Sequence, residues 1–509
     1  MSFEHGKKTI ARTEKGLLRG FKYNDIYHFY GIKYADAKRF MPPEEVEPWE
    51  GLKEATSYGY ICPSLREQTI GNNLKNPHRF WPTSEHCQYL NVWTKNINDD
   101  VRRPVLVWFH GGGFHYGSSL EHKSYDGYNL CDTGDVVVVT LNHRLNALGY
   151  LDLSEYGGKY SKSKNVGNLD LLAALKWINK NIEHFGGDKD NVTLFGQSGG
   201  GAKVVSVMNM PASKGLFKRG LIMSGISGPA MWDFGRDMRE CVSLTLKKSG
   251  ISNDNFADIE TIDPRLLAKN YAKAYKELGM QGVEYFGPSK SEDYIGEPFH
   301  NGYTEHAKHA PLIIGTNFSE FSNLPQCYDR NTMTREEMVL AIEEKFGKEH
   351  AVKIVELFEK TFPNNRLIDV LAYDVEMMRK TTCDMVKCRC DSGCAPTYNY
   401  FFNPIFRIND GSTALHSSDI AFMFKNIQMV PSTYMGEGVA EHIQHEMADR
   451  LLSFAKTGEP QIDNDIEWKE SSSNLIKTMI FSEKCEVREN FDKELIEYLL
   501  SIKQCPSEK

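Results

Sequence analysis

Continuous apolar runs that end at glycine-rich turns set the strongest constraint on how this chain can fold. Residues 103–110 (RPVLVWFH) and 135–145 (DVVVVTLNHRL) are such runs, typical of strands that are covered on both faces. A further strand is predicted at 191–197 (NVTLFGQ), after a segment at 165–187 that has helical apolar spacing and ends on glycine. Strand, helix and strand in this order predict an α/β fold, with a large, mostly parallel central sheet flanked by helices.

The second half of the chain is predicted to be more helical. Amphipathic patterns at 335–362 and 368–388 indicate helices within a helical insertion at about 325–410 that covers the core sheet. A late helix is predicted at 441–458 and should pack back on the sheet. Because no repeat or low-complexity linker divides the sequence, we expect a single domain over residues 1–509.

Charge and hydropathy exclude two classes of partner. The chain has 60 Lys and Arg against 68 Asp and Glu, a net charge of −8, so it has no basic excess with which to bind nucleic acid. The N-terminal residues contain no apolar secretory signal, and nowhere does an apolar run reach the roughly 18 residues of a membrane span. We therefore expect a soluble, cytoplasmic protein without a membrane anchor.

Eleven cysteines, an odd number in a long chain, fit reduced thiols better than a disulfide framework. Four of them, Cys383, Cys388, Cys390 and Cys394, raise the alternative of a metal site. Structural zinc sites combine closely spaced ligands in two pairs, and this cluster has no clear second pair. We interpret these residues as structural or incidental thiols and expect no metal.

A candidate nucleophile lies where the strand at 191–197 meets the following helix. Gly196-Gln197-Ser198-Gly199-Gly200 matches G-x-S-x-G, the pattern of a nucleophile elbow, in the strand-to-helix setting that such an elbow requires. Flanking glycines permit a tight turn and leave space for a substrate carbonyl beside the hydroxyl. The alternative is a plain glycine-rich turn. A serine hydroxyl also needs a base, and the base needs an orienting acid.

A second glycine cluster is a candidate oxyanion hole. The segment 109–117 (FHGGGFHYG) follows a predicted strand, and consecutive glycines let the N–H groups of Gly112 and Gly113 approach one oxygen. The N–H of Gly199 would be a third donor. A turn that merely needs a positive φ would explain one glycine but not three.

Together with several other segments, these motifs resemble the type-B carboxylesterase/cholinesterase family of α/β-hydrolases. The resemblance runs nearly end to end, so it implies an α/β-hydrolase fold, with N-terminal hairpins over residues 1–40. The matching blocks are GLLRGFKYNDIYHFYGIKYA (16–35), SEHCQYLNVWT (84–94), LNHRLNALGYL (141–151), GLFKRGLIMSG (215–225) and FAKTGEPQ (454–461).

The resemblance also implies a triad in the chain order Ser, Glu, His. The segment 312–321 (LIIGTNFSEF) assigns the acid to Glu320, and 414–424 (ALHSSDIAFMF) assigns the base to His416. The residues alone could not select either, because the chain has 16 histidines and 68 acidic residues. Asp419 is a rival acid, but we expect it to cap the segment that follows it. The predicted helical insertion lies between acid and base.

Supporting contacts are implied in the same way. The resemblance pairs Arg39 with Glu85 and Arg144 with Asp170 in partly buried ion pairs. Ser224, in LIMSG, resembles a buried serine beside the triad acid, although a simple core hydroxyl is an equal alternative.

Two cysteines match a disulfide position of the family. Cys62 and Cys87 resemble the first disulfide of the family; we expect them to lie close together, with the bond optional in a reducing compartment.

In the elbow, Gln197 stands where the family usually has glutamate, and Gly199 where it has alanine. Neither change removes a catalytic group.

The substrate class follows from a further departure. Cholinesterases place a tryptophan before the block that matches SEHCQYLNVWT (84–94) here, and this tryptophan binds a quaternary ammonium. In this chain that position corresponds to Lys75 or Pro77, and Trp81 is out of register. This favours a broad carboxylesterase, similar to bacterial p-nitrobenzyl esterases. Candidate walls of the acyl pocket, otherwise core residues, are Phe114, Met231 and Trp232.

We therefore predict a serine carboxylesterase that hydrolyses small to medium, uncharged esters through an acyl-enzyme. Its only partners would be the small-molecule ester and water, and it would need no cofactor. Two alternatives remain: a lipase acting on long-chain acyl esters, and a non-catalytic adhesion-type member of the fold. Members of the latter kind lose the serine and carry a signal and membrane anchor, whereas this chain retains Ser198.

Overall fold

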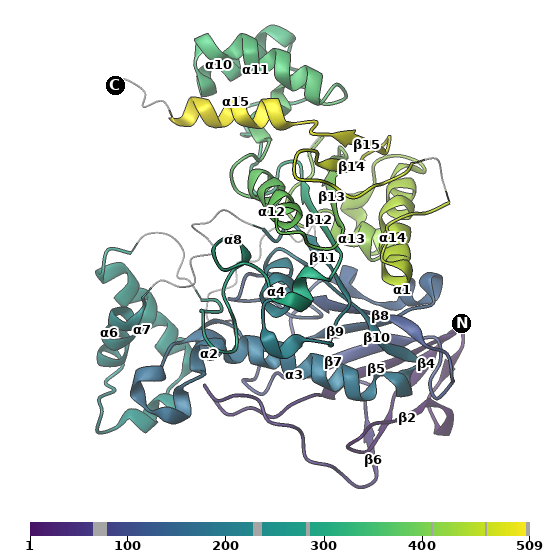
Figure 1. Ribbon diagram of the computed structural model, residues 1–509, viewed down its shortest axis with the longest axis vertical. Coiled ribbons are helices and arrows are strands. Elements are labelled where there is room, and N and C mark those ends of the chain that lie inside the picture. Colours follow the sequence, from purple (N-terminus) through teal and green to yellow (C-terminus); the bar gives the residue numbers. More distant parts are fainter. Residues whose placement is uncertain (65–78, 227–236, 281–285, 409–410, 464–465, 505–509) are drawn as a thin grey trace.

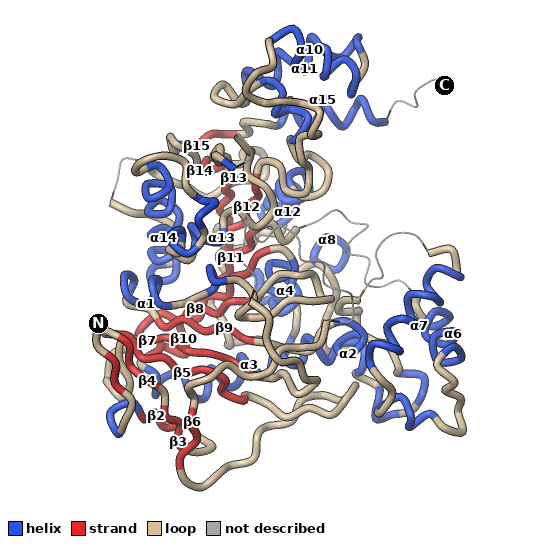
Figure 2. The backbone as a smooth tube through the Cα atoms, turned by 180° about the vertical axis from the view of Figure 1, so that it is seen from behind, coloured by secondary structure: helices blue, strands red, loops and turns tan. Residues whose placement is uncertain are grey.

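A twisted sheet forms the centre of the molecule (Figures 1 and 2). The computed structural model describes residues 1–64, 79–226, 237–280, 286–408, 411–463 and 466–504. Its main sheet has the strand order β1-β4-β5-β7-β9-β8-β10-β11-β12-β13-β14-β15, and every neighbouring pair from β9 to β14 is parallel. The strands are β1 (Phe3–Glu4), β4 (Phe21–Tyr23), β5 (Ile26–Lys33), β7 (Tyr89–Thr94), β8 (Arg103–Phe109), β9 (Val137–Leu141), β10 (Gly187–Gln197), β11 (Arg219–Met223), β12 (Leu312–Asn317), β13 (Thr397–Phe402), β14 (Lys477–Phe481) and β15 (Glu486–Glu489).

The N-terminal strands are antiparallel. β4 pairs with β5 at one edge of the main sheet, and a small separate sheet has the order β2-β3-β6. In it β2 and β3 are antiparallel neighbours, and β6 adds a parallel strand. These strands are β2 (Ile10–Arg12), β3 (Leu17–Arg19) and β6 (Leu52–Glu54).

Both faces of the parallel strands are buried, which explains their continuous apolar sequences. Along β8, Val105 and Val107 belong to the core on the side of α3 and α4, whereas Leu106 and Trp108 belong to the core on the side of α1 and α14. Successive side chains of a strand point to opposite faces, so both must be apolar. The predicted α/β architecture is confirmed. The helices of these two layers are α1 (Tyr128–Gly134), α3 (Val166–Asn181), α4 (Gly199–Met208) and α14 (Val439–Thr457).

The second half differs from its prediction in two places. The helix predicted at 335–362 is broken at Gly347, whose φ of 94° a helix cannot accommodate, and the segment about 325–410 also contains β13, a strand of the main sheet. The predicted helix 368–388 is shifted toward the C-terminus and packs on β12 and β13. Further helices of the second half are α10 (Arg335–Phe346), α11 (Lys348–Thr361), α12 (Arg379–Asp391), α13 (Ile420–Met423) and α15 (Lys493–Gln504).

Two groups of helices stand apart from the sheet layers. α10 and α11 gather with the C-terminal α15 at one end of the molecule, and α6 and α7 form a pair at one side (Figure 1). Among the described residues, no helix has both the length and the apolar character that a membrane crossing requires. The helices not yet given are α2 (Asn146–Tyr150), α6 (Arg239–Lys248), α7 (Pro264–Glu277), α8 (Pro298–Asn301) and α9 (Glu305–Lys308).

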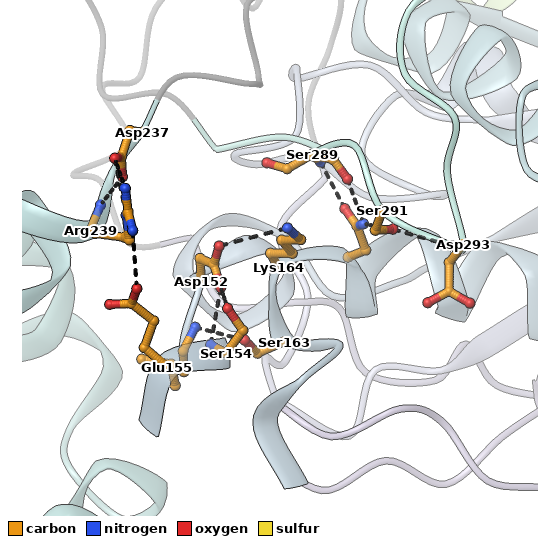
Figure 3. A network of polar contacts seen from close by, with 12 residues as sticks. Asp152, Ser154, Glu155, Ser163, Lys164, Asp237, Arg239, Ser289, Ser291 and Asp293 are labelled. Carbon is orange, nitrogen blue, oxygen red and sulfur yellow. Dashed lines mark hydrogen bonds and ion pairs between the residues drawn. The ribbon is translucent and has the colours of Figure 1, made fainter. Parts of the chain in front are cut away.

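A polar network fastens the start of α6 and the segment 289–293 to the region before α3 (Figure 3). Glu155 forms an ion pair with Arg239, and the Asn165 side chain donates to the Ser289 carbonyl at 2.7 Å and to the Ser291 hydroxyl at 2.9 Å. The short loop before α3 therefore anchors two segments that are distant in sequence.

A buried ion pair joins the loop after β9 to α3. The Arg144 guanidinium bonds both carboxylate oxygens of Asp170, at 2.6 and 2.8 Å, and also donates to the carbonyls of Lys38 and Met41. Both side chains are at most 2% exposed. The pair expected for Arg39 and Glu85 is also formed, in a less buried setting.

Replacement of Asp170 by asparagine should lower the free energy of unfolding by about 3–5 kcal/mol, because it leaves the Arg144 charge buried without its partner. Urea unfolding followed by tryptophan fluorescence measures the loss. The control is Glu356→Gln, which breaks an exposed pair with Lys353 and should cost less than about 1 kcal/mol. Equal losses in the two variants would contradict this assignment.

Candidate active site

Ser198 occupies a strained turn between β10 and α4. Its φ of 58° and ψ of −127° lie in a region that residues other than glycine rarely adopt, and its N–H donates to the Met223 carbonyl at 2.8 Å. A Cβ on Gly200 would lie 2.0 Å from the Phe109 carbonyl oxygen, so only glycine fits there. Ser198 is partly exposed although both of its neighbours in the chain are buried, which leaves its hydroxyl within reach of a ligand.

Glu320 follows the end of β12 and is 1% exposed. Its Oε1 accepts from the Ser224 hydroxyl at 2.6 Å and from the Asn317 N–H at 2.7 Å. Hydrogen bonds donated to a carboxylate favour its charged form, so these groups offset part of the cost of burial. Ser224 thus touches the predicted acid directly.

His416 faces this carboxylate. Its Nδ1 lies 2.5 Å from Glu320 Oε2, and its backbone N–H donates to the Glu320 carbonyl at 2.8 Å. The Asn317 side chain donates to the Leu415 carbonyl at 2.9 Å and the Ser319 N–H to the Ala414 carbonyl at 2.9 Å, so the loop of the acid is joined to the loop of the base at several points. Since an ionised carboxylate can only accept, Nδ1 carries the proton and Nε2 is the free acceptor.

The imidazole lies against the elbow. The side-chain nitrogen of Gln197, the residue before Ser198, lies 3.2 Å from His416 Nε2 and 3.5 Å from Nδ1. Because it is almost equally close to both ring nitrogens, this amide lies beside the imidazole ring and does not occupy the lone pair of Nε2. Within the described part of the chain, the Ser198 hydroxyl makes no hydrogen bond of its own, and catalytic hydrogen bonds often tighten only when substrate binds.

The glycine run 111–113 lies against the elbow. Gly112 and Gly113 have φ values of 85° and 61°. A Cβ placed on Gly199 would lie 2.3 Å from both the nitrogen and the Cα of Gly113. The alanine usual in the family would collide with this loop, so Gly199 and the close approach of Gly113 belong together. Of the three predicted donors, the backbones of Gly113 and Gly199 are in direct contact.

Strained backbone gathers at this edge of the sheet. Ser198, Ser224 and Glu320 all have positive φ, and they follow the adjacent parallel strands β10, β11 and β12. Ser417, next to the predicted base, has a φ of 71°. Strain of this kind costs of order 1–3 kcal/mol per residue and clusters at functional sites.

Asp419 is buried near the predicted acid, Glu320, but it does not contact the imidazole. Its Oδ2 accepts from the Tyr400 hydroxyl at 2.7 Å, and burial raises its pKa to about 6. It occupies the position before α13, yet in the described structure its side chain makes no capping hydrogen bond. The expectation that Asp419 caps this helix is therefore wrong, because a tyrosine from β13 takes its carboxylate instead.

Of the three predicted pocket residues, the structure describes only Phe114. Phe114 is 2% exposed, and its ring centroid lies 5.2 Å from that of Tyr150 in the core. Four residues lie outside the described ranges: Met231, Trp232, Lys75 and Pro77.

One aromatic residue escaped the sequence analysis. The ring of Phe321 lies 4.0 Å from the His416 ring, centroid to centroid, and Phe321 is 51% exposed. It directly follows the predicted acid, and its place beside Glu320 was the only available signal.

The cysteines within the described ranges hold free thiols. Cys62 and Cys87 share a small buried cluster with Leu145 and Leu148, so the expected proximity is found, and neither forms a disulfide in this structure. Over the described ranges, no group of three or more His, Cys, Asp or Glu residues could hold a metal ion. The thiols near α12 are free as well: Cys383, Cys388, Cys390 and Cys394.

Comparison with known proteins agrees with this geometry. A sequence profile of the carboxylesterase family matches residues 7–499. The para-nitrobenzyl esterase of Bacillus subtilis (strain 168) is 30% identical over 499 residues, which cover 95% of this chain and 97% of that protein.

Solved structures agree as well. An esterase from the anaerobe Clostridium hathewayi, described as able to hydrolyse aliphatic aromatic polyesters, superposes with a TM-score of 0.94 at 40% identity, covering 98% of this chain and 99% of that one. A thermophilic PNB esterase gives a TM-score of 0.76 at 27% identity, covering 97% and 100%. The resemblance noted in the sequence is thus confirmed: the chain belongs to the carboxylesterase family and is a carboxylic-ester hydrolase with the α/β-hydrolase fold.

Proposed function

We propose that the chain hydrolyses esters through an acyl-enzyme on Ser198, with His416 as the base and Glu320 as the orienting acid. The observation that carries this proposal is the 2.5 Å contact between His416 Nδ1 and Glu320, with the imidazole against Gln197 of the elbow that holds Ser198. This combination of a strained serine, an oriented imidazole and a buried carboxylate is the arrangement that activates a hydroxyl.

The chemistry proceeds in two halves. His416 Nε2 takes the Ser198 proton as the oxygen attacks the ester carbonyl carbon, while Glu320 stabilises the imidazolium that forms. The imidazolium then protonates the leaving alcohol, and an acyl-enzyme remains. Water, activated by the same imidazole, attacks the acyl carbon, and the acid is released as Ser198 regains its proton.

The negative oxygen that develops in each half needs donors. We assign them to the N–H groups of Gly112, Gly113 and Gly199. The contact between the backbones of Gly113 and Gly199 supports this assignment, as does the position of Gly199 at the N-terminus of α4, where the helix dipole favours negative charge.

For the substrate we propose small to medium, uncharged esters, including those with an aromatic acyl group. The exposed Phe321 ring beside the imidazole offers an aromatic surface on which such a group could stack. The relative from Clostridium hathewayi is described as acting on aliphatic aromatic polyesters, which agrees with this class of substrate.

Replacement of Ser198 by alanine should lower kcat/KM for p-nitrophenyl butyrate by about 10⁴-fold or more, because the nucleophile is lost. The control is Ser206→Ala, which removes a buried hydroxyl from the same helix and should leave turnover near normal. Circular dichroism verifies that both variants fold. Near-normal turnover in the Ser198 variant would refute the assignment.

The length of the preferred acyl chain separates an esterase from a lipase. The wild-type enzyme should prefer p-nitrophenyl acetate, butyrate or octanoate to palmitate. A preference for palmitate, with higher activity above the solubility limit of the substrate, would instead favour a lipase.

A carboxylate at position 197 should shift the pH dependence of turnover. In Gln197→Glu, the new negative charge beside His416 stabilises the protonated imidazole, so the acidic limb of the kcat/KM profile should move to higher pH by about one pH unit. Gln197→Met removes the amide without adding charge and should leave that limb in place. A shift to lower pH in the glutamate variant would contradict the contact described here.

Removal of the Phe321 ring should affect aromatic substrates selectively. In Phe321→Ala, the ratio of kcat/KM for p-nitrophenyl benzoate to that for p-nitrophenyl acetate should fall by about 2- to 10-fold, the loss expected for one aromatic contact. Phe3→Ala is the matched control, since it removes an exposed ring that stacks on Phe21 at 5.6 Å near the N-terminus. An unchanged ratio would exclude a stacking role.

A further inference from the structure

A lysine is buried directly beneath the glycine run 111–113. Lys203 lies on α4, five residues after Ser198, and is 0% exposed. Its Nζ donates to the His110 carbonyl at 2.9 Å and lies 3.5 Å from the Gly111 carbonyl oxygen. It also lies 5.8 Å from the centroid of the Phe114 ring. All three contacts are with residues 110–114, which we call the oxyanion loop.

Nothing in the packing of α4 calls for a charge at this position. Every residue of the helix is buried, and the neighbours of Lys203 in sequence are Ala202 and Val204. An ammonium taken out of water costs several kcal/mol unless polar groups replace its hydration. An apolar side chain would fill the position without that cost, so the charge itself needs an explanation.

The two histidines near Lys203 do not add a second cation. The rings of His110 and His143 lie 5.4 Å apart in a tilted arrangement, and burial lowers the pKa of both well below its ordinary value. Burial also lowers the pKa of Lys203 to about 7, against the opposing effects of the Glu121 carboxyl and the Cys62 thiol. Within the described residues Lys203 forms no close ion pair, so backbone carbonyls are its main partners.

The orientation of these carbonyls sets the direction of the neighbouring N–H groups. The described chain contains no cis peptide bond, and in a trans peptide the C=O and the following N–H point in opposite directions. The Gly111 carbonyl accepts from His110 Nδ1 at 2.9 Å and faces Lys203, so the N–H of Gly112 must point to the other side of the loop. The loop also lies against the elbow, since a Cβ on Gly111 would be 3.6 Å from Ser198 Cβ and a Cβ on Gly199 would be 2.3 Å from the Gly113 nitrogen.

We propose that Lys203 is a positioning residue for the oxyanion hole: its ammonium fixes the His110 and Gly111 carbonyls, which aims the N–H of Gly112 at the oxygen bound over Ser198. The inference rests on the proposed function of Ser198 and the oxyanion loop. The ammonium also places a positive charge behind the peptides that face a developing negative charge, in a medium of low dielectric constant where such a charge acts strongly.

The test compares Lys203→Met with wild-type enzyme. Kinetics with p-nitrophenyl acetate are measured at about pH 6, where an ammonium with this pKa carries its proton. We expect kcat to fall by about 10²-fold, the typical effect of disturbing one oxyanion donor, with KM changed much less. A trifluoromethyl ketone, which adds to the serine and forms a tetrahedral oxyanion, should lose affinity by a similar factor.

A structural role is distinguished by a matched control and by a milder variant. Arg219→Met removes another buried cation, which bonds Asn191 and the Ala455 carbonyl at the start of β11, away from the elbow. It should lower the melting temperature without changing ketone affinity. If Lys203→Met fails to fold, Lys203→Gln is tested in its place, because glutamine keeps a hydrogen-bond donor but removes the charge. The ketone affinity of this variant should fall, but by less than is expected when the donor is removed completely.

Two outcomes overturn the inference. One is a Lys203 variant that folds and retains wild-type kcat and ketone affinity. The other is a loss of melting temperature like that of Arg219→Met, with kinetics of the folded fraction unchanged. In either case, loss of activity in Ser198→Ala would leave the proposed function standing, whereas an active Ser198→Ala would reject the function first.

Discussion

The burial of the parallel strands on both faces is the constraint on which the rest of the molecule depends. Because helices cover each face, functional side chains can be presented only where the strands end. The strands β10, β11 and β12 are parallel neighbours, so their carboxyl ends meet at one edge and bring Ser198, Ser224 and Glu320 together. The backbone at all three residues is strained, and the regular hydrogen bonding of the adjoining strands holds it in place.

The elbow and the oxyanion loop are held together by contacts from α4. Gly199 makes room for the Gly113 backbone, and Lys203, one turn further along α4, contacts the carbonyls at the start of the same loop. In the proposed mechanism, polar groups from one helix act on this loop in two ways, through an N–H group at its first residue and through an ammonium one turn later. The collision that a Cβ on Gly199 would make with Gly113 accounts for glycine in place of the usual alanine of the family.

Sequence reasoning predicted the strands and the elbow well because burial leaves a direct trace in residue type. It located Glu320 and His416 only through family resemblance, since nothing in their immediate neighbours distinguishes them among the 68 acidic residues and 16 histidines of the chain. It missed β13 because that strand follows a helix within a segment whose pattern is helical, and it misjudged Asp419 because the partner, Tyr400, is on a different element. Phe321 and Lys203 were missed because the exposure of the Phe321 ring and the burial of the Lys203 side chain depend on tertiary packing, which the local sequence does not reveal.

The order of the elements along the chain has a consequence for biosynthesis. Under the proposed mechanism, the nucleophile, its elbow and the oxyanion loop are complete once β11 has been made, whereas the carboxylate and imidazole come from residues after β12 and β13. A nascent polypeptide released from the ribosome only as far as β11 would then hold an unactivated hydroxyl. Esterolysis by this mechanism would begin only after the second half has joined the sheet, so the appearance of turnover would report the completion of the whole sheet rather than the folding of its first strands.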